Sequence, residues 1–501
     1  MFQTLCSSIR RNVRVLAALV AANMAASGIA GAQQPTPERF HLQEARITDI
    51  QRALLVKEIT SVGLVELYLK RIKAYNNTCV SEPMGILGPI TTIPHARQVN
   101  ALSTLNLRPA VRKAWGFDER KARSMTDAGD NDPKMPDALE FAAAQDRQLK
   151  RTGRLVGPLH GVVMAIKDQY DTFDLRTTSG ADVQYANDRP PEDATFVKRL
   201  RDAGAIILAK ANLAEYATDG ARSSFGGTFC NPYDTEREPG MSSAGSAASV
   251  AANLVTCAIG EETVVSIRWP ASVNSLVGLA PTEELVSRKG MMGAGLSMRT
   301  GPICRSVPDA ARILDVIAGY DPKDELTAFS VGRKTAQPYL NSAASRRLDG
   351  LRIGVIREYM ARKLFSKADE ESIDIVDRAI EDLRKLGATI VDPRPGRRSV
   401  RCLLRAVRAG APEQRVYPSV SGPVPGHWKR RRRPASIGFS VDAAGSSRGS
   451  GASAANSFAS QPEYTRCRGR RQIHDEQVSA GTRRRQHQNQ RGPDLEGEVL
   501  R

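Results

Sequence analysis

Strand-like and helix-like hydrophobic patterns alternate through the middle of this 501-residue chain. Apolar residues recur at three- and four-residue intervals within residues 47–74, where Thr60 and Ser61 form a predicted N-cap, and again over residues 137–150. The other expected elements are strands at 162–166, 205–208, 353–356 and 389–391 and helices at 194–202, 307–317 and 369–386. Such alternation predicts an α/β domain with a largely parallel sheet.

Residues 76–136 interrupt this pattern. The segment has no sustained apolar period and contains several prolines, which disfavour both helix interiors and central strands. We therefore expect an elaborated loop over the core, and we assign it no chemistry.

Two serine clusters flank a run of about twenty residues rich in Ala and Val, between Pro239 and Pro270. The first cluster contains Ser242 and Ser243, and the second contains Ser266. The small apolar run between them predicts a buried helix and a short strand that hold two loops together. Upstream, Lys167 directly follows the predicted strand 162–166.

The strongly basic charge is confined to one end of the chain. The formal net charge is +18, but residues 394–501 alone carry 22 Lys and Arg against 8 Asp and Glu, a balance of +14. The remaining residues carry 50 against 46, or +4, which is ordinary for a soluble enzyme. The charge of the main part of the chain therefore does not indicate a nucleic-acid-binding protein.

Residues 1–32 have the pattern of a secretory signal peptide. Arginines at 10, 11 and 14 precede an apolar run of about a dozen residues, and Ala30-Gly31-Ala32 fits the small-x-small cleavage rule. An uncleaved membrane anchor is the alternative, although the apolar run is shorter than the ~20 residues of a spanning helix. We expect a periplasmic or secreted protein with no membrane segment after cleavage.

Residues 394–501 differ in composition from everything before them. Arg, Ser, Gly, Pro and Ala dominate, and no apolar period is sustained. One interpretation is a disordered basic tail; the other is out-of-frame translation of a GC-rich gene, which favours these residues. We expect three parts: a signal peptide at 1–32, a C-terminally incomplete domain at 33–393, and a frameshifted, disordered tail at 394–501. Whether the chain as written is active depends on this last segment.

The seven cysteines include no Cys-x-x-Cys pair and give no zinc signature. Four of them fall in the expected folded part: Cys79, Cys230, Cys257 and Cys304. One or two disulfides and buried free thiols both remain open. We expect neither a metal nor a cofactor.

Histidine chemistry is poorly supported. Of the six histidines, three lie in the unusual tail, and His160 precedes a turn where a structural role is the simpler interpretation. No Gly-x-Ser-x-Gly elbow followed by Asp and His is present. A Ser-His-Asp hydrolase is therefore excluded as the leading hypothesis.

Several ordered motifs instead resemble those of the amidase signature family. Beside the serine-rich stretch, they are Gly157-Pro158-Leu159-His160-Gly161 leading to Lys167-Asp168, then Thr177-Thr178-Ser179-Gly180, Gly204 to Asn212, Gly226-Gly227 with Asn231-Pro232-Tyr233-Asp234, Val277 to Thr282, and Gly301 to Val307. The resemblance covers about residues 47–393. It implies one mixed sheet wrapped by helices, with a serine–lysine cluster near its centre.

The resemblance also implies a Ser-Ser-Lys triad that cleaves a carboxylic amide through an acyl-serine intermediate. In this chain Lys167 would be the general base, Ser242 the bridging serine and Ser266 the nucleophile. A lysine can act as a base only when neutral, so its pKa has to fall by burial. The expected oxyanion donors are the backbone N–H groups of Thr263, Val264 and Val265. The expected supporting residues are Ser243, Glu262 and Arg268; for Ser243 and its neighbour Ser246, helix capping and packing are the simpler interpretation.

This chain departs from the family pattern next to the nucleophile. Val264 and Val265 stand where the family usually has two glycines, and a β-branched residue at positive φ is a rare outlier. Either the turn uses negative φ, or oxyanion donors are lost. Glu262 stands where an aspartate is commoner.

Three alternatives to an active amidase remain open. An inactive paralogue acting as a binding protein is suggested by Val264 and Val265 and by the altered C-terminal part. A protein like the A-subunit of glutamyl-tRNA amidotransferase is disfavoured by the leader, because tRNA work is cytoplasmic. Nucleic-acid binding through the tail is disfavoured because no folded module accompanies its charges. We expect a small-molecule amide as the partner, and a homodimer could form.

The leader makes a direct prediction. Expression in an exporting host should give a mature chain that begins at or near Gln33, because cleavage follows the small-x-small signal. N-terminal mass spectrometry of the exported protein checks this. Full-length chain with Met1 intact in the cytoplasm would contradict it.

Overall fold

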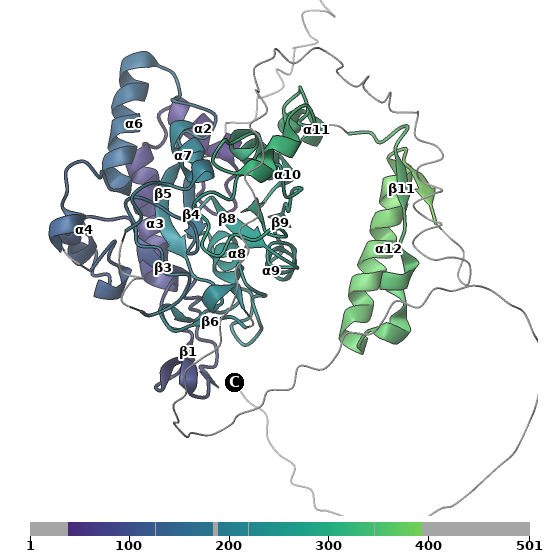
Figure 1. Cartoon of the computed structure of the whole chain (residues 1–501), viewed down its shortest axis with the longest axis horizontal. Coiled ribbons are helices and arrows are strands. Elements are labelled where there is room, and N and C mark those ends of the chain that lie inside the picture. The colour runs from purple at the N-terminus through teal and green to yellow at the C-terminus, as the bar shows by residue number, and fades with distance from the viewer. Residues whose placement is uncertain (1–38, 126, 184–188, 219, 345, 393–501) are drawn as a thin grey trace, which may run out of the picture. The chain divides into compact units, whose positions relative to one another are not determined.

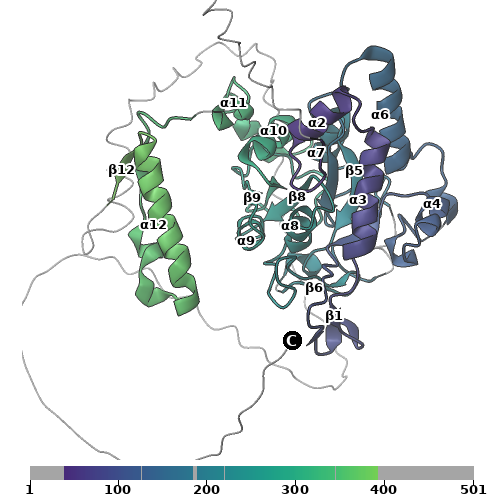
Figure 2. The same cartoon turned by 180° about the vertical axis from the view of Figure 1, so that it is seen from behind.

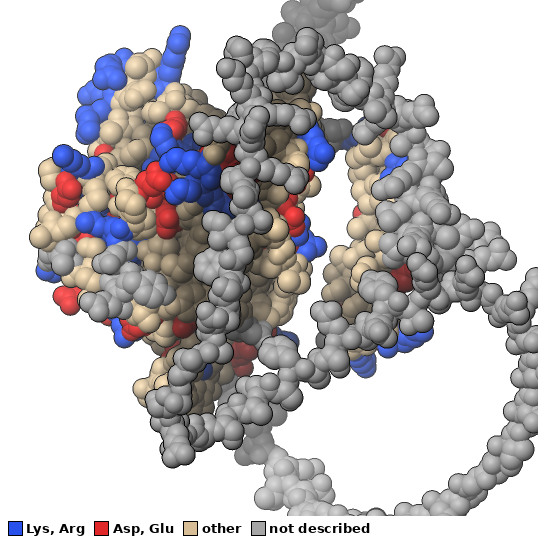
Figure 3. Space-filling model, viewed as in Figure 1, with Lys and Arg blue, Asp and Glu red and all other residues tan. Residues whose placement is uncertain are grey.

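The computed structural model of the chain describes residues 39–392, except for residues 126, 184–188, 219 and 345 (Figure 1). The predicted leader at 1–32 and the predicted tail at 394–501 lie outside the described residues. No helix among the described residues is both long enough and apolar enough to cross a bilayer. On the face seen in Figure 3, basic and acidic side chains are interspersed over the described residues.

A six-stranded sheet forms the centre of the described chain (Figures 1 and 2). In spatial order its strands are β3 (Leu102–Leu105), β5 (Ile206–Ala211), β4 (Val163–Lys167), β8 (Cys257–Glu262), β10 (Arg299–Cys304) and β9 (Val277–Gly278). Strands β5, β4 and β8 are parallel to one another, whereas β3, β10 and β9 each pair antiparallel with their neighbour. Four of the six strands therefore run in one direction, which confirms the expected mixed, largely parallel sheet.

Helices cover both faces of this sheet. Side chains alternate along a strand, so Val163 and Ala165 enter one apolar cluster while Met164 and Ile166 enter the other. The first cluster includes residues of α3 (Ser61–Tyr75), α6 (Ala138–Thr152) and α8 (Ala244–Ala251). The second includes residues of α7 (Thr195–Asp202) and α10 (Val307–Ile317), whereas α2 (Ile47–Leu55) contributes Ile47 to the second cluster and Ile50 and Leu54 to the first. The same alternation places Lys167 on the face that α8 covers.

The predicted helices begin where local chemistry favours them. The Thr60 hydroxyl accepts a hydrogen bond from the backbone N–H of Gly63 at the start of α3. Asp137 and Glu140 form a reciprocal capping box at the start of α6. Such side chains satisfy backbone donors that have no partner inside the helix. The sequence therefore placed these helix starts to within one residue.

The expectation of a loop over residues 76–136 was wrong. Residues 102–105 form β3, an edge strand of the central sheet, and α4 (Pro109–Ala114) follows it. All four residues of β3 are buried, so the strand has no alternation of apolar and polar positions to reveal it. The segment also contains a small antiparallel pair, β1 (Val80–Ser81) and β2 (Thr91–Thr92).

Both outcomes left open for the cysteines occur. Cys79, next to β1, forms a disulfide with Cys230. Cys257 and Cys304 are buried free thiols on the paired strands β8 and β10.

A second, smaller sheet follows in the chain. Strands β11 (Arg352–Gly354) and β12 (Thr389–Val391) are parallel, and α12 (Glu370–Lys385) connects them. Ile373 and Ile380 are the buried residues of α12. These elements match the predicted strand–helix–strand order. The other short elements are α5 (Asp127–Asp130), β6 (Arg222–Ser223), β7 (Gly227–Thr228), α9 (Arg268–Val273) and α11 (Tyr339–Ala343).

Helix α8 packs close to the sheet because its residues are small. Seven of its eight residues are buried, and it contacts β8, β4 and β10. A Cβ atom on Gly245 would lie 2.1 Å from the Asn212 carbonyl oxygen and 2.7 Å from that of Ala101. Both obstacles are backbone atoms, which cannot rotate away. Only glycine fits at this position.

This packing predicts the effect of one methyl group. Gly245→Ala should lower the free energy of unfolding by about 1–3 kcal/mol or more, because the helix must move away from the sheet. Urea unfolding followed by circular dichroism measures the change. Gly295→Ala is the matched control, because its Cβ would meet only the Met298 side chain, at 3.8 Å. Equal stability of the two variants would contradict the prediction.

Candidate active site

Lys167, at the carboxyl end of β4, is completely buried. Its Nζ donates hydrogen bonds to Ser242 Oγ at 2.7 Å, to Glu261 Oε2 at 3.0 Å and to the Glu261 carbonyl oxygen at 3.3 Å. An ammonium group has three protons to donate, so this site offers one acceptor for each. Two segments distant in sequence, at the start of α8 and the end of β8, supply these acceptors.

Burial lowers the pKa of Lys167 below the ordinary value of lysine. The carboxylate of Glu261 opposes this shift through its charge and its hydrogen bond, and that of Glu262 opposes it through charge alone. Desolvation favours the neutral amine, whereas a nearby opposite charge favours the ammonium form. Burial and the two carboxylates therefore shift the pKa of Lys167 in opposite directions.

Ser242 lies just before α8 and is also completely buried. Its carbonyl oxygen accepts a hydrogen bond from the Ala214 backbone N–H at 3.2 Å, which fixes the backbone beside Lys167. The predicted contact between Lys167 and Ser242 is thus present in the structure.

Ser266 lies on the loop between β8 and α9 and is partly exposed. Its carbonyl oxygen accepts a hydrogen bond from the Ser243 backbone N–H at 3.3 Å, which brings this loop beside Ser242. Within the described residues its hydroxyl forms no hydrogen bond. The structure therefore gathers Lys167, Ser242 and Ser266 in one place and forms the first of the two predicted links of the relay. Such bonds are often long without substrate and shorten when it binds.

The loop before Ser266 exposes backbone donors. The N–H groups of Thr263, Val264 and Val265 have no acceptor among the described residues. Neither valine has positive φ. Of the two possibilities that the sequence left open, a turn with negative φ or a loss of oxyanion donors, the first therefore applies. The Val264 side chain is 70% exposed, which leaves it clear of the loop's interior. The two β-branched residues are therefore accommodated without left-handed backbone strain.

Glu262 and Arg268 hold this loop in shape. The buried Glu262 carboxylate accepts hydrogen bonds from the backbone N–H groups of Ile267 and Arg268, each at 3.0 Å, at the start of α9. Its other oxygen accepts from Arg268 Nε at 2.8 Å, and the same guanidinium donates to the Val264 carbonyl oxygen. Both side chains thus bind the loop that carries Ser266.

The capping interpretation of Ser243 was wrong, because its side chain makes no capping bond to α8. Its hydroxyl donates to the Glu261 carbonyl oxygen at 2.9 Å and accepts from the Glu261 N–H at 3.1 Å. The Ser246 hydroxyl donates to the Ile259 carbonyl oxygen at 3.0 Å. Because β4 pairs with β8 only as far as Ile259, Glu261 needs another backbone partner, and Ser243 supplies it.

Sequence reasoning missed Glu261. Its carboxylate is buried, contacts Lys167 and accepts a hydrogen bond from the Thr263 hydroxyl at 2.9 Å. One signal could have identified it: two adjacent carboxylates, Glu261 and Glu262, end a strand that is otherwise small and apolar. Adjacent strand residues point to opposite faces, so both cannot be solvated at the end of a covered strand.

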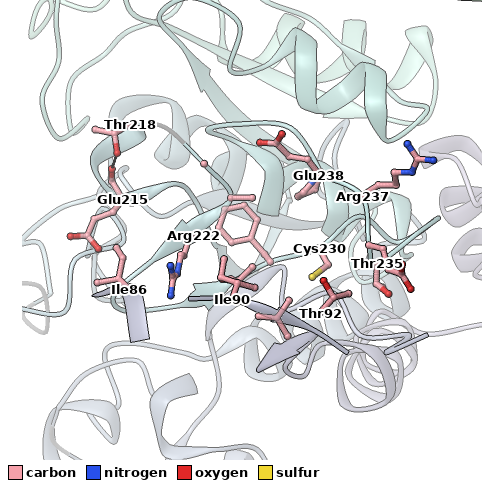
Figure 4. Close-up of a pocket in the computed structure, with 17 residues that line it drawn as sticks. Ile86, Ile90, Thr92, Glu215, Thr218, Arg222, Cys230, Thr235, Arg237 and Glu238 are labelled. Carbon is pink, nitrogen blue, oxygen red and sulfur yellow. Dashed lines mark hydrogen bonds between the residues drawn. The ribbon is translucent and has the colours of Figure 1, made fainter. Parts of the chain in front are cut away.

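A cavity of about 400 Å³ lies beside the segment that leads to Ser242, although Lys167, Ser242 and Ser266 do not line it (Figure 4). Ile86 and Ile90 contribute apolar surface from the connection between β1 and β2, and Glu215, Arg222 and Glu238 add charged groups. Glu238 is four residues before Ser242, so by chain length their Cα atoms lie within about 14 Å of each other. Cys230 lines the cavity, and its disulfide to Cys79 ties the β1 region to this wall.

Other chemistries find little support among the described residues. No group of three or more His, Cys, Asp or Glu side chains there is arranged to hold a metal ion. His160 is buried, and its Nδ1 accepts a hydrogen bond from the Val156 backbone N–H. This contact fits the structural role expected for His160.

Known proteins resemble this chain over most of the described region. The profile of the family described as Amidase matches residues 132–411, more than half of the chain and somewhat beyond Pro393. The A-subunit of a glutamyl-tRNA(Gln) amidotransferase from Heliobacterium modesticaldum is 39% identical over 258 residues, which are 51% of this chain and 50% of that protein. The corresponding protein from Paraburkholderia phytofirmans is 34% identical over 357 residues, 70% of this chain and 61% of that protein.

A solved structure, the native peptide amidase from Stenotrophomonas maltophilia, shares the fold with a TM-score of 0.54 and 33% identity. The match covers 70% of this chain and 62% of that one. The chain spans about half the length of the curated relatives it matches first.

The role of Glu262 in shaping the loop can be measured. Glu262→Ala removes the acceptor of two backbone N–H groups and one guanidinium contact, so it should lower the free energy of unfolding by about 2–4 kcal/mol. Urea unfolding provides the value. Glu236→Ala, which removes an exposed carboxylate, is the control and should change stability by less than about 0.5 kcal/mol. A Glu262→Ala change as small as the control's would show that the loop does not depend on these contacts.

Proposed function

Because this chain belongs to the amidase family, we propose that it hydrolyses a carboxylic amide through the cluster of Lys167, Ser242 and Ser266. The observation that carries the proposal is the buried hydrogen bond between Lys167 Nζ and Ser242 Oγ, beside the loop of Ser266. A buried amine with a lowered pKa next to a hydroxyl is the arrangement that a general base requires.

The proposed reaction begins when Lys167 is neutral. Its Nζ takes the proton of the Ser242 hydroxyl, and Ser242 Oγ takes the proton of the Ser266 hydroxyl as Ser266 Oγ attacks the amide carbon. The backbone N–H groups of Thr263, Val264 and Val265 are available to stabilise the oxyanion, a contribution of about 10²–10³ in rate per donor in other hydrolases. The departing amine receives the proton back through Ser242. Water then repeats the sequence and releases the acid from Ser266.

The cavity of Figure 4 is the proposed place for the part of the substrate remote from the amide. Its lining ends at Pro239, three residues before Ser242, and it combines apolar surface with charged groups. A substrate with an apolar side chain and a polar end would suit this lining. A panel of simple aliphatic amides, aryl amides and peptide carboxamides would identify the preferred class.

Two other functions rest on particular observations. An inactive, ligand-binding relative is suggested by the carboxylate of Glu261 on the amine of Lys167, which opposes a neutral base. A subunit of an amidotransferase assembly is suggested by the names of the Heliobacterium and Paraburkholderia relatives. Turnover of a simple amide by the isolated chain would distinguish the proposed hydrolase from both.

We also propose a periplasmic or secreted location. The leader pattern at residues 1–32 and the Cys79–Cys230 disulfide both suit an oxidising compartment.

The triad predicts a graded loss of activity. Lys167→Ala and Ser266→Ala should each lower kcat/KM for amide hydrolysis by at least about 10²-fold, and Ser242→Ala should lower it severely, because a general base contributes ~10²–10⁴. Release of ammonia or amine is the measurement. A serine-reactive probe followed by peptide mass spectrometry should find the label on Ser266.

Ser249→Ala provides the matched control for these variants. Ser249 is a buried serine of α8, the helix that follows Ser242, and its hydroxyl donates only to the Ser246 carbonyl oxygen. This variant should keep turnover close to that of the unaltered chain. A Lys167→Ala rate within tenfold of the unaltered chain would rule out the proposed role of Lys167.

A further inference from the structure

The partner of Lys167 that the proposed reaction does not use is Glu261. Its Oε2 lies 3.0 Å from Lys167 Nζ, and both side chains are completely buried. Its other oxygen, Oε1, accepts a hydrogen bond from the Thr263 hydroxyl. The backbone of Glu261 is held on both sides of its Cα by Ser243. The carboxylate is therefore fixed in position, with no solvent to separate it from the amine.

We propose that Glu261 is a positioning residue that holds Lys167 as an ammonium ion, so that the base becomes available only as the pH rises. This inference rests on the proposed function for its consequence in catalysis, but not for the state of the ion pair itself. The physical reason is the attraction between opposite charges in a dry site, which is much stronger than the same attraction in water. A protonated Lys167 cannot accept the proton of Ser242.

Among the charged groups around Lys167, Glu261 has the dominant effect on the protonation of its amine. From β8, Glu262 also favours the ammonium form, but its oxygens bind the Ile267 and Arg268 backbone and the Arg268 guanidinium. Directly after β4, Asp168 pairs with Lys210 of β5, at 3.4 Å. The segment before α8 contributes only the neutral hydroxyl of Ser242.

The sign of the expected pH dependence follows from these contacts. Burial lowers the pKa of Lys167, and the charge of Glu261 raises it again. Removing that charge while keeping the shape should leave burial opposed only by the charge of Glu262. The amine would then lose its proton at a lower pH, and the acid limb of the activity profile would move in the same direction.

The decisive experiment compares the full chain with its Glu261→Gln variant by NMR. Lysine labelled with ¹³C at Cε reports the protonation of Lys167, and Lys167→Met assigns its signal. The titration midpoint should fall by about 1–3 pH units in Glu261→Gln, the range that a close opposite charge produces. Glu261→Asp, which retains the charge, should return the midpoint toward that of the unaltered chain. An unchanged midpoint in Glu261→Gln overturns the inference.

Asp168→Asn is the matched control. It also removes a buried carboxylate from a buried lysine, Lys210, but that lysine bonds to Tyr170, Thr172 and Thr177 and to neither catalytic serine. The Lys167 midpoint should stay in place in this variant. A change as large as that of Glu261→Gln would show that Glu261 has no special role, and it would overturn the inference. Circular dichroism of each variant verifies that the comparison is made on folded protein.

Kinetics then separate this inference from the proposed function. If both hold, kcat/KM in Glu261→Gln should rise about tenfold for each pH unit by which the midpoint falls, measured below the midpoint of the variant, and the alkaline plateau should stay the same. A purely structural role for Glu261 would instead lower the rate at every pH, and that result would count against the inference. If the NMR midpoint moves but no chain hydrolyses amides at any pH, the ion-pair inference stands and the proposed hydrolase fails.

Discussion

A completely buried lysine is the feature on which the rest of this structure depends. An isolated buried ammonium is very costly, so such a group has to be paired, hydrogen-bonded or neutral. Lys167 satisfies this condition with a serine hydroxyl, a carboxylate and a carbonyl oxygen. Its position at the carboxyl end of a central parallel strand is where open α/β sheets generally bind their ligands. The same constraint that governs its stability thus also makes it a candidate base.

The small residues of α8 make this arrangement possible. A helix of Ala, Gly and Ser can lie close enough to the sheet for Ser243 and Ser246 to bond the backbone of β8. The bonds of Ser243 replace the strand partner that Glu261 lacks, because β8 pairs with β4 only as far as Ile259. As a result Ser242, at the start of the helix, reaches the end of β4. The serines of this stretch therefore divide into those that join helix to strand and the one that contacts Lys167.

The loop of Ser266 accommodates two valines without left-handed backbone strain. Val264 and Val265 replace the glycines expected by resemblance, but their φ values are negative and three N–H groups stay unpaired within the described residues. Glu262 and Arg268 fix the loop through its backbone on both sides of Ser266. The stronger challenge to catalysis comes from Glu261, because it acts on the charge of the base rather than on the shape of the loop.

The sequence by itself determined the alternation of helices and strands, several helix starts and the candidates Lys167, Ser242 and Ser266, because periodicity, capping chemistry and motif order are local properties of the chain. It did not reveal β3, since the four buried residues of this strand do not alternate between apolar and polar. Nor did it reveal the ion pair of Lys167 with Glu261, which are 94 residues apart. Only tertiary structure decides such pairs, because burial and the register of β4 against β8 determine which groups meet without water between them.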